Sequence, residues 1–305
     1  MIHGAELQPV EGPARHGVRG LPAEEPTIVS VSDIHGFIRE GRSALLTLSD
    51  HPEYDPIVET GRLRRLEWVG GDEYVLVVNG DLIDRGAHSD KVLETVERLA
   101  EQAPPGHVRV TLGNHEMGML TPDFFEWGDW YSMSRTDDQR REFARAIEDG
   151  HVVAAYDGYN VTYAHAGQPE PYETPALNEE LRAGATYLAE GIGQTDDPDR
   201  QRELVVEYPA VYGVDGGTGR GPNAGIAWLD FEHMPADAPP QVVGHTRQTR
   251  PVRRGNVVCE NVIRGNRRSD GGEAVVVETP DGLSALARTP DDTVSEREFS
   301  LPVLE

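Results

Sequence analysis

The chain has 305 residues, of which 37% are hydrophobic, and its 53 acidic residues against 28 basic ones give a formal net charge of −25. This charge disfavours general binding to nucleic acid or to anionic membranes, because both would be repelled by the surface. Cys259 is the only cysteine. The composition therefore excludes an internal disulfide and a zinc site built from several thiolates.

The basic residues are unusual in kind, because Lys91 is the single lysine and the other 27 are arginine. A high content of Asp and Glu with almost no lysine resembles proteins of halophilic organisms, where molar salt screens an acidic surface. The alternative is an acidic protein from a GC-rich mesophile. The sequence contains no run of about 20 apolar residues, so no transmembrane helix is predicted. Residues 1–20 lack the apolar centre of a signal peptide. We expect a cytoplasmic protein.

In chain order, residues 1–26 are rich in Gly, Pro, Glu and Arg without periodicity, which predicts an N-terminal tail or loosely attached arm. His3 and His16 in this segment are expected to be solvated. Residues 27–32 form the first predicted strand, which ends in Asp33-Ile34-His35-Gly36. Two residues apart on an extended strand end, Asp33 and His35 would point the same way.

The second strand, residues 74–78, leads into a Gly-bounded loop that presents Asp81, Asp84 and Arg85, groups suited to cations and a phosphate. An amphipathic helix over 88–100 and a third strand over 108–112 follow, and this strand ends at Gly113-Asn114-His115-Glu116. Consecutive βα units predict parallel strands joined by right-handed crossovers. Ligand sites of such sheets lie beyond the carboxyl ends of the strands.

Residues 120–149 are predicted helical, and packing is favoured over a substrate platform for their five aromatic residues: Phe124, Phe125, Trp127, Trp130 and Tyr131. A hairpin of 152–156 and 161–164 turns at Asp157-Gly158 and ends at His165-Ala166-Gly167. Two helices are predicted within 174–206, separated by 191–197.

The Gly-rich segment 213–225 lacks the Gly-Lys-Ser/Thr of a nucleotide-binding P-loop. It is either an active-site loop or a plain surface loop, and Arg220 is its only cation. A short strand over 241–243 ends at Gly244-His245-Thr246. Strands over 257–263, 274–278 and 283–288 are predicted antiparallel. We expect one domain over 27–289 and an exposed acidic tail over 290–305.

The strand ends together present nine polar groups: Asp33, His35, Asp81, Asp84, Arg85, Asn114, His115, His165 and His245. Carboxylate, imidazole and amide ligands suit manganese, iron or zinc. Two metal ions about 3.5–4 Å apart could be held if one carboxylate bridges them. The alternative to metal binding is a structural role, in which these residues form turns, cap helices or bond local backbone groups. This alternative accounts for one or two clusters and leaves the histidines unexplained.

The order of these motifs, from Asp33-Ile34-His35-Gly36 to Gly244-His245-Thr246, resembles the calcineurin-like metallophosphoesterase superfamily. The chain is most similar to its phosphoprotein-phosphatase branch, which includes serine/threonine phosphatases and bacterial diadenosine tetraphosphatases. The resemblance spans residues 33–246. It implies a mixed α/β (α+β) fold of four layers, a β-sandwich flanked by helices, in place of a single doubly wound sheet.

The resemblance also implies roles for individual residues. Six would be metal ligands, with Asp81 bridging two ions: Asp33, His35, Asp81, Asn114, His165 and His245. His115 would be the general acid, with Asp84 fixing its tautomer and orientation. Arg85 would bind the phosphoryl oxygens, and Arg220 is the candidate for a second such arginine. Glu116 completes its motif in a supporting role.

The implied cofactors are two divalent metal ions, with manganese favoured and iron, zinc or nickel as alternatives. The implied mechanism is in-line attack by a metal-bridging hydroxide without a phosphoenzyme. His165-Ala166-Gly167 stands where eukaryotic protein phosphatases commonly have His-Gly-Gly, and with Gly244-His245-Thr246 it is closer to the prokaryotic and diadenosine-tetraphosphatase types.

Three functions follow from these expectations. The first is hydrolysis of phosphomonoesters in phosphorylated proteins, as in a serine/threonine phosphatase. The second is cleavage of a nucleotide anhydride such as diadenosine tetraphosphate, which an aromatic pair near the site would favour. The third is a non-catalytic binding protein on a phosphatase fold, against which all ligand positions carry competent residues. The sequence does not indicate an oligomeric state.

Overall fold

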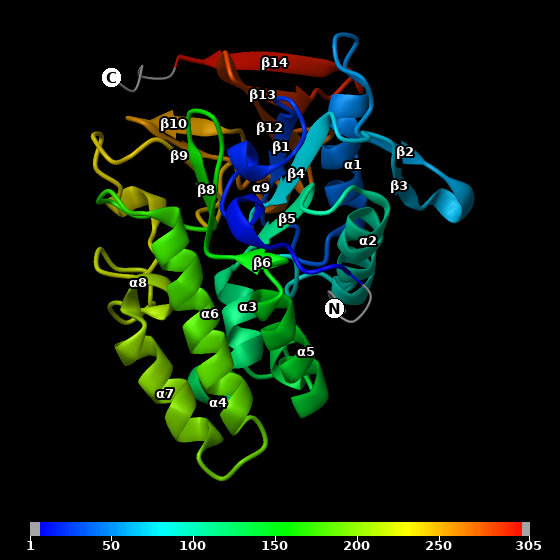
Figure 1. The fold of residues 1–305 in the computed structure, drawn as a ribbon. Helices are drawn as coiled ribbons and strands as arrows, with labels where there is room; N and C mark the ends of the chain where they lie inside the picture. The colour runs from blue at the N-terminus through cyan, green and yellow to red at the C-terminus, as the bar shows by residue number, and fades with distance from the viewer. Residues whose placement is uncertain (1–6, 301–305) are drawn as a thin grey trace.

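The computed structural model describes residues 7–300, which form two β-sheets that face each other, with helices on their outer faces (Figure 1). The larger sheet has seven strands in the spatial order β14-β13-β12-β1-β4-β5-β6. Its strands are β1 (Thr27–Val31), β4 (Tyr74–Val78), β5 (Val108–Thr111), β6 (Val152–Val153), β12 (Ala274–Thr279), β13 (Gly282–Arg288) and β14 (Val294–Phe299).

The smaller sheet has five strands in the order β10-β11-β9-β8-β7. They are β7 (Ala155–Asp157), β8 (Thr162–Ala164), β9 (Gln241–Val243), β10 (Val252–Arg254) and β11 (Val257–Cys259). A separate ribbon, which projects from the body in Figure 1, consists of β2 (Val58–Thr60) and β3 (Leu66–Trp68).

Two long helices, α1 (Ile38–Ser49) and α2 (Ser89–Gln102), pack on the larger sheet. The other α-helices are α3 (Asn114–Leu120), α4 (Pro122–Phe125), α5 (Asp137–Glu148), α6 (Thr174–Gly191), α7 (Asp197–Glu207), α8 (Pro209–Tyr212) and α9 (Ile263–Asn266). Short 3-10 helices are η1 (Gly12–Arg15), η2 (Val18–Gly20), η3 (Arg62–Arg64), η4 (Ser132–Ser134) and η5 (Phe231–His233). No helix within 7–300 has the length and apolar character needed to cross a membrane.

Successive side chains of a strand point to opposite faces of its sheet, so the core is divided into a layer between the sheets and layers beneath the helices. Ile28 and Val75 of the larger sheet belong to the same buried cluster as Tyr163 and Val242 of the smaller one. Their neighbour Val29 belongs to the cluster shared with the helices. The sandwich flanked by helices confirms the expected fold class.

The central strands β1, β4, β5 and β6 run parallel in adjacent positions. Their carboxyl ends therefore meet at one edge of the sheet, as the three βα units predicted. Asp33, Asp81 and Asn114 follow β1, β4 and β5 at this edge. The fold thus brings together clusters that are far apart in the sequence.

Two strand predictions need correction, and two edge strands were missed. The segment 152–156 is split, because the chain leaves the larger sheet at Ala154 and only β7 pairs with β8 as a hairpin. The segment 257–263 is a strand only to Cys259, and β11 runs parallel to β9 and antiparallel to β10. The chain turns out of the sheet beyond it, since Asn261 bonds Asp33 in the site. The edge strands β10 and β14 were not predicted.

The expected terminal tails also differ from the structure. Val18 and Leu21 are buried between the sheets, and Arg15 donates to the carbonyl of Glu148, so residues 7–26 are anchored by apolar burial and backbone bonding. His16 lies within hydrogen-bond distance of Asn178, whereas His3 lies outside the described residues. At the other end, β14 pairs with β13, although most of its side chains are exposed. The domain boundaries at 27 and 289 stay a prediction.

Candidate active site

A hollow of about 390 Å³ lies at the carboxyl ends of the central strands. It is lined by strand-end residues together with arginines and tryptophans from the loops. They are His35, Asp81, Arg85, Asn114, His115, Trp127, Trp130, Thr218, Arg220, Trp228, His245, Arg247, Asn261 and Arg264. Seven of the ten residues proposed for the site from the sequence are in this list. The other three, Asp33, Asp84 and His165, are buried and bond to residues that line the hollow.

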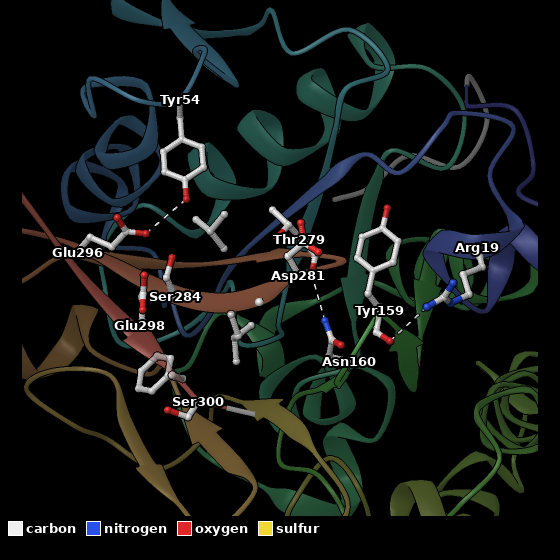
Figure 2. Close-up of a pocket in the computed structure, with 14 residues that line it drawn as sticks. Arg19, Tyr54, Tyr159, Asn160, Thr279, Asp281, Ser284, Glu296, Glu298 and Ser300 are labelled. Atoms are coloured by element: carbon white, nitrogen blue, oxygen red, sulfur yellow. Dashed lines mark hydrogen bonds between the residues drawn. The ribbon is translucent and has the colours of Figure 1, made fainter. Parts of the chain in front are cut away.

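A larger hollow of about 830 Å³ lies beside β12, β13 and β14 (Figure 2). Its polar side chains are spread around its rim, and bonded pairs among its lining residues include Asn160 with the carbonyl of Thr279 at 3.1 Å and Tyr54 with Glu296 at 3.4 Å. None of the ten proposed site residues lines it. The hollow at the strand ends is therefore the candidate active site.

The backbone at the site takes a conformation that L-residues rarely adopt. Within 7–300, eleven non-glycine residues have a positive φ, and six of these are site residues. The six are Asp33, His35, Asp81, Asp84, Arg85 and His245. Asp and His tolerate the left-handed region better than most residues, and such backbone persists where surrounding contacts hold it. Asp33 and His35 therefore converge through left-handed turns and not on the extended strand end that their spacing suggested.

Asp81 lies at the centre of the site and faces three imidazoles. Its Oδ2 is 3.4 Å from His35 Nε2 and 3.9 Å from His115 Nε2, and its Oδ1 is 3.5 Å from His165 Nε2. Burial opposes the charged form of Asp81, but the three neighbouring imidazoles outweigh it and hold its pKa well below the usual range. The ionised carboxylate has one oxygen toward each side of the site.

Hydrogen bonds to the backbone fix which ring nitrogen of two histidines carries a proton. His35 Nδ1 lies 2.9 Å from the carbonyl of Ile83, and His165 Nδ1 lies 2.9 Å from that of Asn79. A carbonyl only accepts, so each Nδ1 carries the proton and each Nε2 turns a lone pair to the centre. Burial lowers the pKa of His35 to about 3, which keeps this ring neutral.

On the far side of Asp81, two further side chains converge on His165 within hydrogen-bond distance. His165 Nε2 is 3.2 Å from His245 Nδ1 and 3.3 Å from Asn114 Oδ1. Burial lowers the pKa of His165, but the charge of Asp81 outweighs this effect and raises it to about 9. A proton and a metal ion compete for this lone pair, so the same field attracts a cation.

Asp33 is held from both ends of its carboxylate. The backbone N–H of His245 donates to Oδ2 at 2.9 Å, and Asn261 Nδ2 donates to Oδ1 at 2.6 Å. Burial raises the pKa of Asp33 to about 7. Glu116 has the supporting place that its motif suggested, because its two oxygens accept the backbone N–H groups of Asp81 and Leu82.

His115 is oriented by a second carboxylate. Its Nδ1 donates to Asp84 Oδ2 at 2.6 Å, and Asp84 also accepts two bonds from Ser132, one from its backbone N–H and one from its hydroxyl. His115 Nε2 is left facing the hollow, 3.2 Å from an Arg85 nitrogen. Trp130 stacks on the His115 ring with centroids 4.9 Å apart.

These geometries fit divalent metal ions. The site offers buried carboxylate, imidazole and amide donors whose lone pairs point into a shared space, and such ligands suit manganese, iron and zinc. Two sets of three donors have their ligand atoms within 4.8 Å of one another, namely His35-Asp81-His115 and Asp81-His165-His245. Both sets contain Asp81, which is the arrangement that a bridging carboxylate requires.

The comparison with known proteins identifies the family of the chain. Residues 26–211 match the family model described as "Calcineurin-like phosphoesterase". The chain belongs to the calcineurin-like phosphoesterase family. Membership of this family favours a phosphoester hydrolase over the non-catalytic alternative. The family is dinuclear-metal dependent, and the donor sets around Asp81 could hold the ions.

Individual relatives of this phosphoesterase are distant. Shewanella-like protein phosphatase 2 of Arabidopsis thaliana is 29% identical over 124 residues, which are 35% of this chain and 27% of that protein. The chain thus aligns with about a quarter of that relative. A cold-active protein-tyrosine phosphatase of a psychrophilic Shewanella species has a TM-score of 0.59 at 17% identity, over 94% of this chain and 85% of its own. A mutant cold-active protein tyrosine phosphatase gives 0.61 at 18%, over the same shares. These structural likenesses show the fold alone.

Several site residues of the phosphoesterase were not assigned a role from the sequence: Ser132, Thr218, Arg247, Asn261 and Arg264. Only Asn261 and Arg264 carried any signal, because they follow a strand. The aromatic residues were favoured as packing groups. Trp127 and Trp130 do pack on each other, with centroids 5.2 Å apart, but they also line the hollow.

Proposed function

We propose that this phosphoesterase hydrolyses phosphomonoesters of phosphorylated proteins at the strand-end site. The observation that carries the proposal is the imidazole of His115, which Asp84 orients toward the hollow next to Arg85 and the donors around Asp81. This arrangement supports the proposal, because a candidate proton donor, a candidate phosphate-binding cation and candidate metal ligands surround one space.

The ligand assignment follows the donor geometry. Asp33 and His35 would hold one ion and Asp81 both, while the second ion would take three further ligands: Asn114, His165 and His245. When bound, two divalent ions would activate the attacking water and neutralise phosphoryl charge. Manganese is the ion we propose, since the donor set offers oxygen and nitrogen without sulfur.

His115 could instead be read as a ligand, because its Nε2 lies within the first donor set. We assign it as the proton donor, because the carboxylate of Asp84, which belongs to neither donor set, holds Nδ1 and leaves Nε2 facing the hollow. Asp84 holds the ring from behind and so fixes which nitrogen faces the ester. The protonated ring would deliver its Nε2 proton to the leaving oxygen.

Arg85 and Arg220 are the proposed phosphoryl-binding residues. Arg85 is exposed and turns its guanidinium over Trp130, with the central carbon 4.8 Å from the ring centroid. Arg220 comes from the Gly-rich loop and is fixed by an ion pair of 2.8 Å with Asp230 and a bond of 3.1 Å to Thr246. This pairing positions Arg220 but also neutralises part of its charge, so Arg85 should contribute more to phosphate binding.

A phosphoprotein substrate is supported by the names of the relatives, which are a protein phosphatase and protein-tyrosine phosphatases. A second candidate, cleavage of a dinucleoside polyphosphate, is favoured by one feature of the hollow. Trp127, Trp130 and Trp228 all line it, and an aromatic face near the metal site could stack a nucleobase.

Product analysis separates the two candidates. The protein is incubated in molar KCl with Mn²⁺ and, in parallel, a phosphothreonine peptide, a phosphotyrosine peptide and diadenosine tetraphosphate. We expect inorganic phosphate from the peptides, and its loss in Asp81→Asn and His115→Asn variants but not in Asp72→Asn, an exposed control. Nucleotide products alone would assign the protein to the anhydride hydrolases, and unchanged rates in the first two variants would overturn the site.

A further inference from the structure

Arg247 and Arg264 stand out among the cations of the site. Both line the hollow, yet within residues 7–300 neither side chain has an ion pair or a hydrogen bond. Arg140 and Arg288, in contrast, are paired with Asp197 and Asp50. Arg247 and Arg264 thus present two unpaired cations to one hollow in a chain with a net charge of −25.

The fold brings these two arginines together from different segments. The loop after β9 carries Arg247, and α9 carries Arg264. The N–H of Gln248 donates to the carbonyl of Asn261 at 2.8 Å, and Asn266 Nδ2 donates to the carbonyl of Thr249 at 2.8 Å. These bonds cross-link the two segments, directly after Arg247 in one and on both sides of Arg264 in the other.

Gly265 allows the close approach of the two segments. A Cβ at this position would lie 1.9 Å from the carbonyl oxygen of Gln248, a distance at which the backbone would have to move. Only glycine therefore permits this contact next to Arg264. The positions of the two arginines are a built feature of the fold and do not depend on flexible side chains alone.

The arginines converge although their charges repel. Burial, together with the charges of Arg85 and Arg247, lowers the pKa of the Arg264 guanidinium. Like charges held close in a hollow raise the energy of the free protein and attract an anion that relieves the repulsion. The anion bound by Arg85 and Arg220 is the scissile phosphoryl group of the proposed function, so Arg247 and Arg264 are available to another one.

We propose that Arg247 and Arg264 form a second phosphate subsite, which binds a phosphate group of the substrate other than the one that is hydrolysed. This proposal rests on the proposed function and narrows its substrate class to molecules with at least two phosphate groups. Planar guanidinium groups suit phosphate, because each can donate two parallel hydrogen bonds. The second phosphate belongs either to a neighbouring phosphorylated residue or to a nucleotide polyphosphate chain.

Binding is measured apart from turnover, by the fluorescence of the tryptophans at the hollow in a His115→Asn background at fixed KCl concentration. The ligands are a peptide with one phosphothreonine, peptides with a second phosphorylated residue one to three positions away, and diadenosine tetraphosphate. The variants are Arg247→Gln with Arg264→Gln, and Arg250→Gln as a control. Arg250 is exposed in the same loop and does not line the hollow. Melting temperatures check that each variant folds.

The double variant should weaken binding of a ligand with two or more phosphates by about 10-fold or more, since charge-assisted hydrogen bonds are lost. Binding of the singly phosphorylated peptide should change by less than about 2-fold, and Arg250→Gln should alter neither. If the double variant weakens binding only of the doubly phosphorylated peptides, or only of diadenosine tetraphosphate, that ligand identifies the source of the second phosphate. Equal weakening for all ligands, or no change, would overturn the subsite. If the wild type releases no phosphate from any peptide while this binding pattern holds, the proposed function fails and the subsite stands.

Discussion

At the scale of single residues, the geometry of the site depends on the contacts that fix the orientation of its side chains. Asp81 presents one oxygen to each donor set, and Asp33 is fixed by bonds to both of its oxygens. His115 is fixed by Asp84, which is itself held by Ser132. Each reacting group thus has a partner that sets its orientation, as preorganised sites require.

Asp84→Asn should lower kcat for an alkyl phosphate ester by about 10²-fold or more, because His115 loses the carboxylate that orients it and stabilises its charged form. KM and metal content should stay near those of the wild type, since Asp84 belongs to neither donor set. Ser132→Ala should have a smaller effect of the same kind. Steady-state kinetics with a peptide ester and with p-nitrophenyl phosphate check this expectation.

The loss should be smaller for p-nitrophenyl phosphate, because its leaving group needs little protonation. Equal losses for both esters would contradict a role of His115 and Asp84 in proton transfer. A loss of bound metal in Asp84→Asn would show instead that the variant disturbs the donor sets.

The motif residues could be predicted because each directly follows an apolar run, and parallel strands end at one edge. Ser132 and Arg247 could not be predicted in the same way. Ser132 bonds Asp84 across 48 positions of sequence, and Arg247 is one exposed arginine among 27 in the chain. Their roles depend on tertiary neighbours that a local pattern does not encode.

At the scale of secondary-structure elements, a buried carboxylate connects the two sheets. Glu278 of β12 accepts backbone N–H bonds from Tyr159, Asn160 and Val161 and bonds the hydroxyl of Tyr163. These partners belong to the β7–β8 turn and to β8 of the smaller sheet. The turn was predicted from Asp157-Gly158, but its contact with the last strands was not, because it joins segments more than 110 residues apart.

Burial raises the pKa of Glu278 from 4.5 to about 7, against the opposing effect of its hydrogen bonds. The folded state therefore holds a proton that the unfolded state releases, and stability falls as pH rises from about 4.5 to 7. A shift of this size corresponds to about 3 kcal/mol. Glu278→Gln replaces the titrating carboxyl group by an amide, whose oxygen can still accept the backbone N–H bonds, and should flatten this decline in the free energy of unfolding.

Urea unfolding at several pH values between about 5 and 8 tests this expectation. Glu298→Gln, an exposed position on β14 of the same sheet, is the control and should follow the wild type. Glu260 also has a raised pKa, of about 8, so the comparison uses the difference between variant and wild type. Identical profiles for Glu278→Gln and the wild type would contradict a titrating Glu278.

At the scale of the whole molecule, an acidic surface surrounds a site that collects arginines. The net charge is −25, while four arginines line the hollow: Arg85, Arg220, Arg247 and Arg264. The surface repels anions at long range, and the cations attract them at short range. Salt reduces the first effect more than the second, because screening acts most on exposed and distant charges.

We therefore expect the melting temperature to rise by about 5–10 °C as KCl increases from about 0.1 to 2 M, as self-repulsion of the surface is screened. Differential scanning fluorimetry without added metal checks this. As a control, glycerol or sucrose is added to the protein at low salt, at the same osmolality as the KCl. These uncharged solutes should not reproduce the rise in melting temperature. A constant or falling melting temperature would contradict the halophilic interpretation of the composition.

The most direct test of the account is the metal content of the purified protein. After loading with Mn²⁺ and removal of free metal by gel filtration, mass spectrometry of the wild type should find two ions per chain. Asp81→Asn should retain fewer than one, because the bridging carboxylate belongs to both donor sets. A wild type without bound metal, or an Asp81→Asn variant that retains two ions, would contradict a dinuclear site built at the strand ends.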